Sequence, residues 1–368
     1  VGFDRGVYIA VVAWICIVMF RLWVYSCLVA FPQLAQAKIC DESNRVPCMT
    51  LAGGVRMPII SLGTGASSFE HECKDPGPHP PFKNMSCYKK QAMEATKSWL
   101  RLGGSMMDMA QIDQNMVPVA QAMSTVGIGR EDVFFQTKCW GSPNFDATAM
   151  CGFDSLQMLN TSYIDLLLLH TPFRLKPQCW DLLSAGVHHG CESPFYDPGK
   201  EGRQEAWKAL EMLVQQKKVR AIGLSDFSAQ QILDILEVAT VTPAVLQTHW
   251  APGQHNSTLF TFCAKHNITI QAWGAVGAGT WGKRLLSLPE LKRIAASQSS
   301  PARNISTAQV VLRWSNQLGN ALIAGTGNVE HMNSDMDIFD FHLSDADMKA
   351  IWALQPKDEN TESLHVHV

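Results

Sequence analysis

Three ionisable side chains, Asp108, Lys138 and His170, each follow a short apolar segment that has the pattern of a β-strand. Carboxylate, ammonium and imidazole groups held close together are the groups that general acid–base catalysis uses. In a barrel of parallel strands, the carboxyl ends of the strands meet at one rim. The sequence therefore predicts a catalytic site at this rim, although each residue alone has an ordinary structural explanation.

The elements that must hold these residues alternate between short apolar runs and longer amphipathic stretches. We expect strands at residues 58–63, 105–109, 133–138, 163–170, 219–224, 245–249, 269–273 and 321–324. We expect helices at residues 90–102, 115–126, 147–160, 203–216, 228–238, 258–266 and 306–318, and a last helix at 329–337. This alternation is typical of an α/β fold, the (β/α)8 TIM barrel. An open doubly wound sheet is the alternative, but Gly63-Thr-Gly65-Ala-Ser lacks the third glycine of the dinucleotide fingerprint.

Four segments depart from the alternation. Residues 49–57 predict a small hairpin before the first strand, with Gly53-Gly54 at its turn. Residues 67–86 form a Pro-rich, Cys-bearing insertion, residues 171–202 a long loop, and residues 277–303 a second irregular segment. Loops of this length are usually functional or disordered.

Short motifs surround the ionisable residues. They are Gly103-Gly-Ser-Met-Met-Asp108-Met-Ala110-Gln-Ile-Asp113-Gln-Asn115, Phe135-Gln-Thr-Lys138-Cys-Trp140, Leu166-Leu-Leu-Leu-His170-Thr-Pro172, Gly223-Leu-Ser225-Asp226-Phe227, Thr307-Ala-Gln309-Val-Val-Leu312-Arg-Trp314 and Phe339-Asp-Phe341-His-Leu343-Ser. Taken together they resemble the aldo-keto reductase family over roughly residues 49–354. The resemblance implies a barrel domain, with its N-terminal hairpin, at residues 38–368. It also implies NADP(H)-dependent reduction of a small carbonyl substrate.

The resemblance assigns catalytic positions to Asp108, Lys138, His170 and Asp113. Family members use a tyrosine as proton donor, activated by a lysine that is paired with an aspartate, while a neutral histidine orients the carbonyl oxygen. Asp113 stands at the position of this tyrosine. A carboxylate is a poor proton donor at pH 7, and a positioned acid contributes roughly 10²–10⁴-fold. We therefore expect impaired reduction, and a catalytically inactive barrel, a structural subunit or binding module of a membrane assembly, is the alternative.

The resemblance also places a cofactor. Ser225, Asp226 and Gln247 match residues that hold the nicotinamide carboxamide, with Asp226 replacing an asparagine, and Trp273 matches the aromatic residue that stacks on the ring. NADP is the expected cofactor, and NAD or no cofactor remain alternatives.

At the phosphate end, the segment Ile323-Ala-Gly325-Thr326-Gly-Asn stands where NADPH-preferring members often have I-P-K-S. His331 stands at the position of a following arginine, so both positive charges are missing. Backbone N–H groups at the start of the helix expected at residues 329–337 remain able to hold a phosphate.

The N-terminal residues 7–31 are almost wholly apolar, with Arg21 as the only charge. Such a segment is long enough to span a bilayer. It is equally typical of a signal peptide, because Ala35-Gln36-Ala37 has the small-x-small cleavage pattern. We expect residues 1–37 to be a signal peptide or a membrane anchor and leave the two open.

Glycosylation sequons and cysteines favour a lumenal, extracellular or membrane-anchored protein, including a plastid reached by the secretory route. The sequons begin at Asn84, Asn160, Asn256, Asn267 and Asn304. The cysteines beyond residue 37 are Cys40, Cys48, Cys73, Cys87, Cys139, Cys151, Cys179, Cys191 and Cys263. Their odd number leaves at least one free thiol, and the pairing stays open. No C-x-x-C motif is present, so we expect no metal site, and a net charge of −3 with mixed signs argues against nucleic acid.

Overall fold

The computed structural model describes residues 38–41, 44–73, 85–140, 144–176, 195–277 and 279–355. The expected signal peptide or anchor, the sequon at Asn84, and both Cys179 and Cys191 lie outside the described residues. None of the helices in the described ranges is both long enough and apolar enough to cross a membrane.

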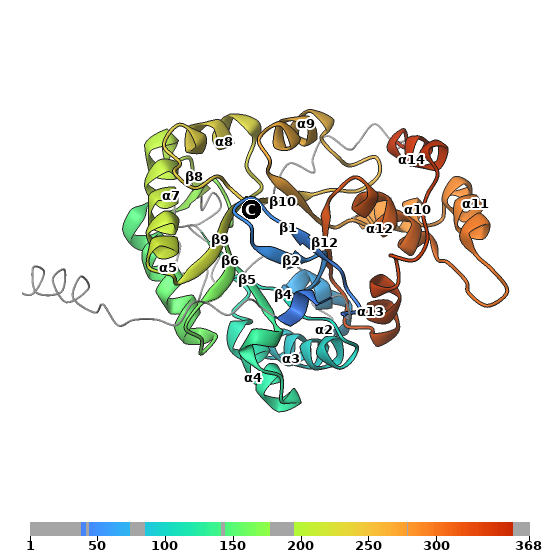
Figure 1. The fold of residues 1–368 in the computed structure, drawn as a ribbon, viewed down its shortest axis with the longest axis horizontal. Coiled ribbons are helices and arrows are strands. Elements are labelled where there is room, and N and C mark those ends of the chain that lie inside the picture. The colour runs from blue at the N-terminus through green and yellow to red at the C-terminus, as the bar shows by residue number, and fades with distance from the viewer. Residues whose placement is uncertain are drawn as a thin grey trace, which may run out of the picture. The chain divides into compact units, whose positions relative to one another are not determined.

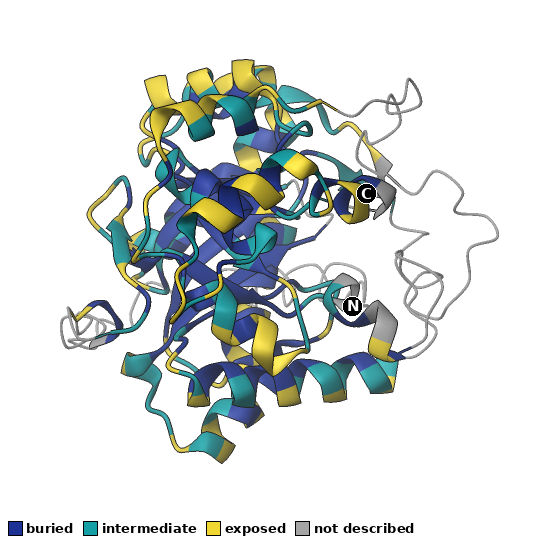
Figure 2. Cartoon of the chain, turned by 90° about the vertical axis from the view of Figure 1, so that its right-hand side faces the viewer, coloured by how far each residue is buried: buried dark blue, intermediate teal, exposed yellow. Residues whose placement is uncertain are grey.

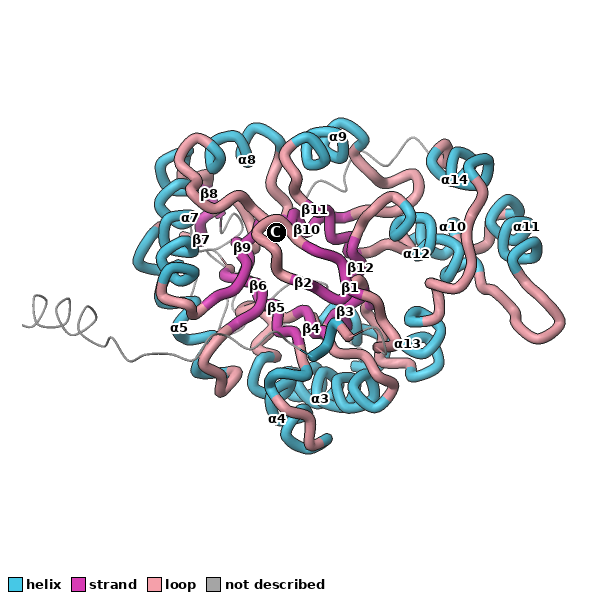
Figure 3. Tube along the Cα trace, in the orientation of Figure 1, coloured by secondary structure: helices cyan, strands magenta, loops and turns pink. Residues whose placement is uncertain are grey.

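Eight parallel strands form a closed barrel, which confirms the predicted fold class. In barrel order they are β3 (Ile60–Gly63), β4 (Met106–Asp108), β5 (Phe134–Cys139), β6 (Ile164–Leu169), β9 (Val219–Ser225), β10 (Val245–His249), β11 (Thr269–Trp273) and β12 (Ala321–Ala324), which pairs back to β3. The strands lie inside a ring of helices (Figure 3). The sequence predicted the bounds of β10, β11 and β12 correctly, and the other strands differ only at their ends.

The ring contains the helices that the amphipathic pattern predicted (Figure 1). They are α3 (Met85–Arg101), α4 (Met116–Val126), α5 (Phe145–Met158), α7 (Gly199–Gln215), α8 (Ala229–Leu236), α9 (Ser257–Lys265), α12 (Thr307–Gln317) and α13 (Val329–Met336). Helices α8 and α12 begin with capping boxes at Ser228 and Ser306. Their inner faces are buried against the strands and their outer faces are exposed (Figure 2).

The structure corrects several expectations about irregular segments. Residues 277–303 contain α10 (Gly279–Leu285) and α11 (Pro289–Gln298), and α14 (Asp345–Trp352) follows the helix that we expected to be last. Short apolar faces explain the misses: α11 buries only Leu291, Ile294 and Ala295. The remaining elements are η1 (Lys38–Cys40), η2 (Ala66–Phe69), α2 (Glu70–Cys73), η3 (Arg130–Asp132), β7 (Arg174–Leu175) and β8 (Phe195–Tyr196).

The predicted N-terminal hairpin is present as β1 (Cys48–Thr50) and β2 (Arg56–Pro58), paired antiparallel. It lies across one end of the barrel (Figure 1). Leu51 and Met57 of the hairpin region share one apolar cluster with the strand residues Met106, Phe134 and Leu166. These residues lie near the amino ends of their strands, so the hairpin closes the end opposite the expected catalytic rim.

Strand β5 shows how the period of two positions the site. Gln136 and Lys138 take part in polar contacts with side chains of other barrel strands. The alternate residues face outward, because Thr137 contacts Met116 of α4 and Cys139 forms a disulfide with Cys151 of α5. The same alternation places Asp108 on the inner face of β4.

Candidate active site

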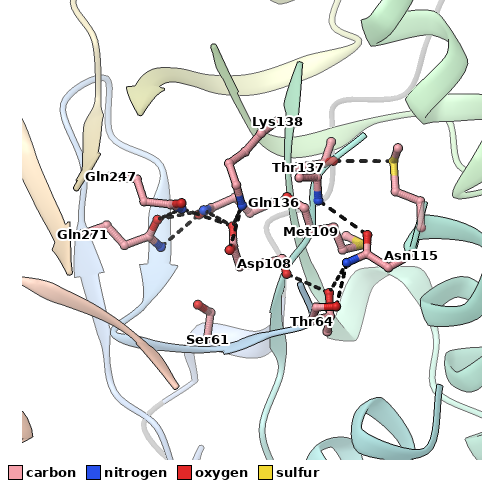
Figure 4. A network of polar contacts seen from close by, with 12 residues as sticks. Ser61, Thr64, Asp108, Met109, Asn115, Gln136, Thr137, Lys138, Gln247 and Gln271 are labelled. Carbon is pink, nitrogen blue, oxygen red and sulfur yellow. Dashed lines mark hydrogen bonds and ion pairs between the residues drawn. The ribbon is translucent and has the colours of Figure 1, made fainter. Parts of the chain in front are cut away.

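A buried ion pair lies at the rim of the barrel. Lys138 Nζ donates to Asp108 Oδ1 and Oδ2, both at 2.7 Å, and to the backbone oxygen of Met109 at 2.8 Å (Figure 4). Lys138 is 5% exposed and Asp108 is 7% exposed. Because a buried ammonium requires both a partner charge and hydrogen bonds, these three contacts fix the position of Lys138.

Three glutamines form a polar layer beside this pair, inside the barrel (Figure 4). Gln136 of β5 donates to Asp108 Oδ1 at 2.6 Å and exchanges hydrogen bonds with Gln271 of β11 at 2.7 and 2.9 Å. Gln247 of β10 donates to Asp108 Oδ1 at 3.2 Å and to Gln271 Oε1 at 2.8 Å. The layer links strands on opposite sides of the barrel and satisfies the buried carboxylate.

Asn115 connects the loop that follows β3 with the loop that follows β4. Its side-chain nitrogen donates to the backbone oxygen of Thr64 at 2.8 Å and to the Thr64 hydroxyl at 2.9 Å. The Thr64 hydroxyl in turn donates to the backbone oxygen of Asp108 at 2.8 Å. Asn115 is 2% exposed, so these contacts form a buried brace beneath the loop that carries Asp113.

Asp113 lies at the rim, on the loop that follows β4. Its Oδ2 atom would lie 3.2 Å from a Cβ atom built on Gly65, which follows β3. Asp113 N donates to Ala110 O at 3.2 Å, within a tight turn. The structure therefore brings a partly buried carboxyl group to the part of the rim where the resemblance places a tyrosine hydroxyl.

His170 follows β6 and is held by its backbone, with its N–H donating to Cys139 O at 3.0 Å. Burial, and next the charge of Lys138, lower the pKa of His170 to about 3. The imidazole is therefore neutral at pH 7. Within the described part of the chain, its buried Nδ1 atom has no hydrogen-bond partner. A neutral histidine with an unsatisfied nitrogen is suited to bind a polar group of a ligand.

The residues expected to hold a nicotinamide ring stand at neighbouring strand ends. Trp273, at the end of β11, is 37% exposed and packs edge-on against His249, with ring centroids 4.7 Å apart. Burial raises the pKa of Asp226 to about 6, partly offset by the hydrogen bond from Trp273 Nε1 at 3.4 Å. Asp226 also has a positive φ of 56°, a conformation that asparagine and aspartate tolerate best among non-glycine residues.

The donors and acceptors of this group fit a carboxamide. Gln247 uses its amide N–H groups on Asp108 and Gln271, which leaves its carbonyl oxygen as an acceptor. Asp226 supplies further acceptor oxygens and Ser225 supplies a hydroxyl donor. The exposed Trp273 adds an aromatic face, so the residues present fit the nicotinamide end of a dinucleotide.

The residues expected to bind the phosphate of the cofactor fit that group less well. Asn328 caps α13, its Oδ1 atom accepting from Glu330 N at 2.7 Å and from His331 N at 3.2 Å. The Thr326 hydroxyl accepts from Asn328 N at 3.1 Å. Two of the N–H groups at the start of the helix expected to hold a phosphate thus already have a partner, and His331 is an exposed side chain without the fixed charge of arginine.

Several contributors were not identified from the sequence as site residues. Gln136, Gln271 and Asn115 are buried polar residues in apolar or motif segments, and their pairing depends on which strands are neighbours in the barrel. The Cys139–Cys151 disulfide, which fixes β5 to α5 next to Lys138, was also missed. No local pattern in the sequence indicates that these two cysteines are paired.

Disulfide formation bears out the expectation that some cysteines pair. The other two bridges in the described ranges are Cys40–Cys48 and Cys73–Cys87, both in the entry region. Cys263 is a buried free thiol, in agreement with the odd number of cysteines. Burial raises its pKa to about 12, so it is not a reactive nucleophile.

A rim that joins a buried Lys–Asp pair, a neutral histidine and donors and acceptors that fit a carboxamide, on a (β/α)8 barrel, is typical of a reductase-like class of protein. The Aldo/keto reductase family model matches residues 82–356, and the chain belongs to this family. Aldo-keto reductases bind NADP(H), and NADP-dependent carbonyl reduction is general to the family.

Related proteins cover most of the chain. Aldo-keto reductase family 1 member A1 of Xenopus tropicalis is 31% identical over 317 residues, which is 83% of this chain and 88% of the relative. Glyoxal reductase of Bacillus subtilis is 31% identical over 270 residues, 73% of this chain and 85% of the relative.

Solved structures agree. An aldo/keto reductase from Brucella melitensis superimposes with a TM-score of 0.65 at 28% identity, covering 83% of this chain and 98% of that one. The Bombyx mori aldo-keto reductase in complex with NADP shares the fold, with a TM-score of 0.68 at 23% identity over 83% of this chain and 92% of that one.

Proposed function

We propose that this chain is a carbonyl reductase with impaired proton transfer, because Asp113 replaces the tyrosine proton donor. The observation that carries the proposal is the Lys138–Asp108 pair at a rim to which Asp113 is also brought, at the position that the resemblance assigns to the tyrosine. A bound nicotinamide dinucleotide supplies the hydride in this chemistry. The chain's own residues bind the cofactor, orient the carbonyl group and manage the proton.

Two of these tasks have residues suited to them. Ser225, Asp226 and Gln247 present one donor and several acceptors to a carboxamide, and Trp273 offers its exposed face to the ring. His170 is neutral, so it binds a carbonyl oxygen through an N–H group without carrying a charge.

The proton transfer lacks its donor. An ionised carboxylate has acceptor atoms only, so Asp113 cannot give a proton to a developing alkoxide. Its side chain is also shorter than that of tyrosine. Because a positioned acid contributes roughly 10²–10⁴-fold, we expect turnover to be reduced by about this factor.

Restoring the hydroxyl tests the proposal. We expect Asp113→Tyr to raise kcat/KM for a generic aromatic aldehyde by about 10²–10⁴-fold. The matched control is Asp113→Phe, which has the same ring without a hydroxyl and should show no such gain. Equal rates in the two variants would show that missing proton donation is not what limits this protein.

A second function, a barrel that acts as a binding or structural module without turnover, is favoured by one observation. Both amide N–H groups of Gln247 are already bonded to Asp108 and Gln271, so these donors serve the internal polar layer and only the carbonyl oxygen is left for a ligand. Fast aldehyde reduction by the wild type, abolished by Lys138→Met, would eliminate this alternative. Failure of Asp113→Tyr to reduce any aldehyde, while cofactor still binds, would favour it.

We also propose that the chain folds in an oxidising compartment of the secretory route. The disulfides of the described ranges support this proposal, because such bridges are rare in the cytosol. The asparagines of the four described sequons are exposed: Asn160, Asn256, Asn267 and Asn304. Membrane attachment through residues 1–37 remains part of the proposal.

Expression in eukaryotic cells with residues 1–37 retained tests this route. We expect N-glycosidase to increase the gel mobility, and Asn→Gln changes at the sequons to remove that response one step at a time. Protein that has no glycan and in which alkylation labels Cys139 and Cys151 would contradict the proposed route.

A further inference from the structure

Two segments far apart in the sequence meet at the expected phosphate end of the site. The β12–α13 loop is covered by the insertion that follows β3. A Cβ atom built on Gly325 would lie 2.7 Å from Ser68 Oγ, and one on Gly327 would lie 2.9 Å from Glu72 Oε1. The insertion therefore packs closely against both glycines, and the Glu72 carboxylate lies directly beside the loop.

The residues on both sides of Glu72 hold it in this place. Phe69 is fully buried, and its ring lies 3.6 Å from the Cβ position of Gly327. Cys73 forms a disulfide with Cys87 on α3. Glu72 itself is exposed, so its carboxylate is accessible from solvent beside the loop where the resemblance places the cofactor phosphate.

The charge in this region is wrong for a phosphate group. Neither residues 66–73 nor residues 325–331 contain a lysine or an arginine, whereas Glu72 and Glu330 are both exposed acids. The Asn328 side chain accepts from Glu330 N and His331 N in the first turn of α13. These two segments contain histidines at positions 71 and 331 but no residue with a fixed positive charge, so a ribose 2′-phosphate would meet two carboxylates without a lysine or an arginine to offset them.

We propose that the adenosine end of this site selects a ribose with a free 2′-hydroxyl, that is NAD(H) rather than NADP(H), and that Glu72 is the discriminating residue. The inference rests on the proposed cofactor-dependent function. A carboxylate accepts hydrogen bonds from ribose hydroxyls and repels a 2′-phosphate, which is the rule in other dinucleotide-binding sites.

Calorimetric titration of the protein with NAD⁺ and with NADP⁺ tests the inference without any turnover. We expect NAD⁺ to bind at least about tenfold more tightly than NADP⁺ at low ionic strength, and this ratio of the two affinities should be smaller in high salt. In the Glu72→Gln variant the affinity ratio should fall, and in the Glu72→Lys variant it should approach one or invert. Glu205→Lys, an exposed acid on α7, makes the same charge change elsewhere and should leave the ratio unchanged.

The outcomes separate this inference from the proposed function. Tighter binding of NADP⁺ by the wild type, or the same ratio in Glu72→Lys and Glu205→Lys, overturns the role of Glu72 and leaves a cofactor-dependent reductase in place. Binding of neither dinucleotide overturns both. Thermal unfolding of each variant in the absence of cofactor confirms that the substitutions have not altered the fold.

Discussion

The two halves of the barrel differ in how they are held together. The half at residues 38–176, which we call the catalytic half, contains the buried Lys138–Asp108 pair and the three disulfides of the described ranges. The half at residues 195–355, which we call the cofactor half, contains the free thiol Cys263 and the partly exposed acid Asp226.

The two halves also differ in how their residues depart from the aldo-keto reductase motifs. The catalytic half contains the Lys138–Asp108 ion pair, and in our proposal it lacks one group, the tyrosine hydroxyl. In the cofactor half, the resemblance places changes of charge at Asp226 and at residues 325–331. Removing one partner of the buried pair would leave an uncompensated buried charge, whereas Asp226 and the ionisable side chains of residues 325–331 are partly or fully exposed and are less constrained by folding.

The largest effect is expected in the catalytic half. Asp108→Leu leaves the Lys138 ammonium buried without its counter-charge, which should cost about 3–5 kcal/mol in the free energy of unfolding. The double variant Asp108→Leu/Lys138→Met removes both charges and should recover much of that loss. Urea unfolding of the four proteins completes the cycle, and additive losses would show that the pair is not coupled.

The next effect tests the bracing of the catalytic half. Replacing Cys139 and Cys151 by alanine opens a bridge between residues that are 12 apart in the sequence, and should cost about 3 kcal/mol of stability. Opening Cys40–Cys48, with a separation of 8, should cost slightly less. Only the loss of the Cys139–Cys151 bridge should also alter the affinity for the cofactor, because Cys139 adjoins Lys138. Equal effects on affinity would show that the position of the bridge is irrelevant to the site.

A smaller effect tests the link between the halves. Gln271 is fully buried and accepts from both Gln136 and Gln247. Gln271→Leu leaves their amide groups without this acceptor and should cost about 1–3 kcal/mol. Ile270→Val, on the outer face of the same strand, should cost only about 0.5–1.5 kcal/mol. A Gln271→Leu protein as stable as the wild type would mean that the polar layer does not couple the two halves.

The smallest effect is a pH dependence of the cofactor half. The folded-state pKa of Asp226 is about 6, above its ordinary value of 3.8, so the folded state binds this proton more tightly than the unfolded state. The resulting stabilisation is fully present below about pH 4 and is lost as pH rises through 6. Asp226→Asn should therefore match the wild type near pH 4 and be about 1–2 kcal/mol more stable at pH 7, discounted for partial exposure. A difference in unfolding free energy between the wild type and Asp226→Asn that is the same at all pH values would contradict a raised folded-state pKa for Asp226.

Local pattern was sufficient to predict the barrel strands and to name Asp108, Lys138 and His170 as candidate site residues. Apolar runs bounded by turn residues located β10, β11 and β12, and the positions of Asp108 and Lys138 at the ends of expected parallel strands placed them at one rim. The motif around Asp113 led to the prediction that an aspartate stands at the position of the family's tyrosine. These features are encoded within a few residues of one another, so the sequence alone determined them.

Contacts between distant segments were decided only by the tertiary structure. The bonds among Gln136, Gln247 and Gln271 depend on barrel closure, and the Cys139–Cys151 pairing depends on how α5 packs on β5. The place of Glu72 beside Gly327 joins residues more than 250 apart in the chain. No local spacing specifies such contacts, because they arise when packing brings independent segments to the same rim.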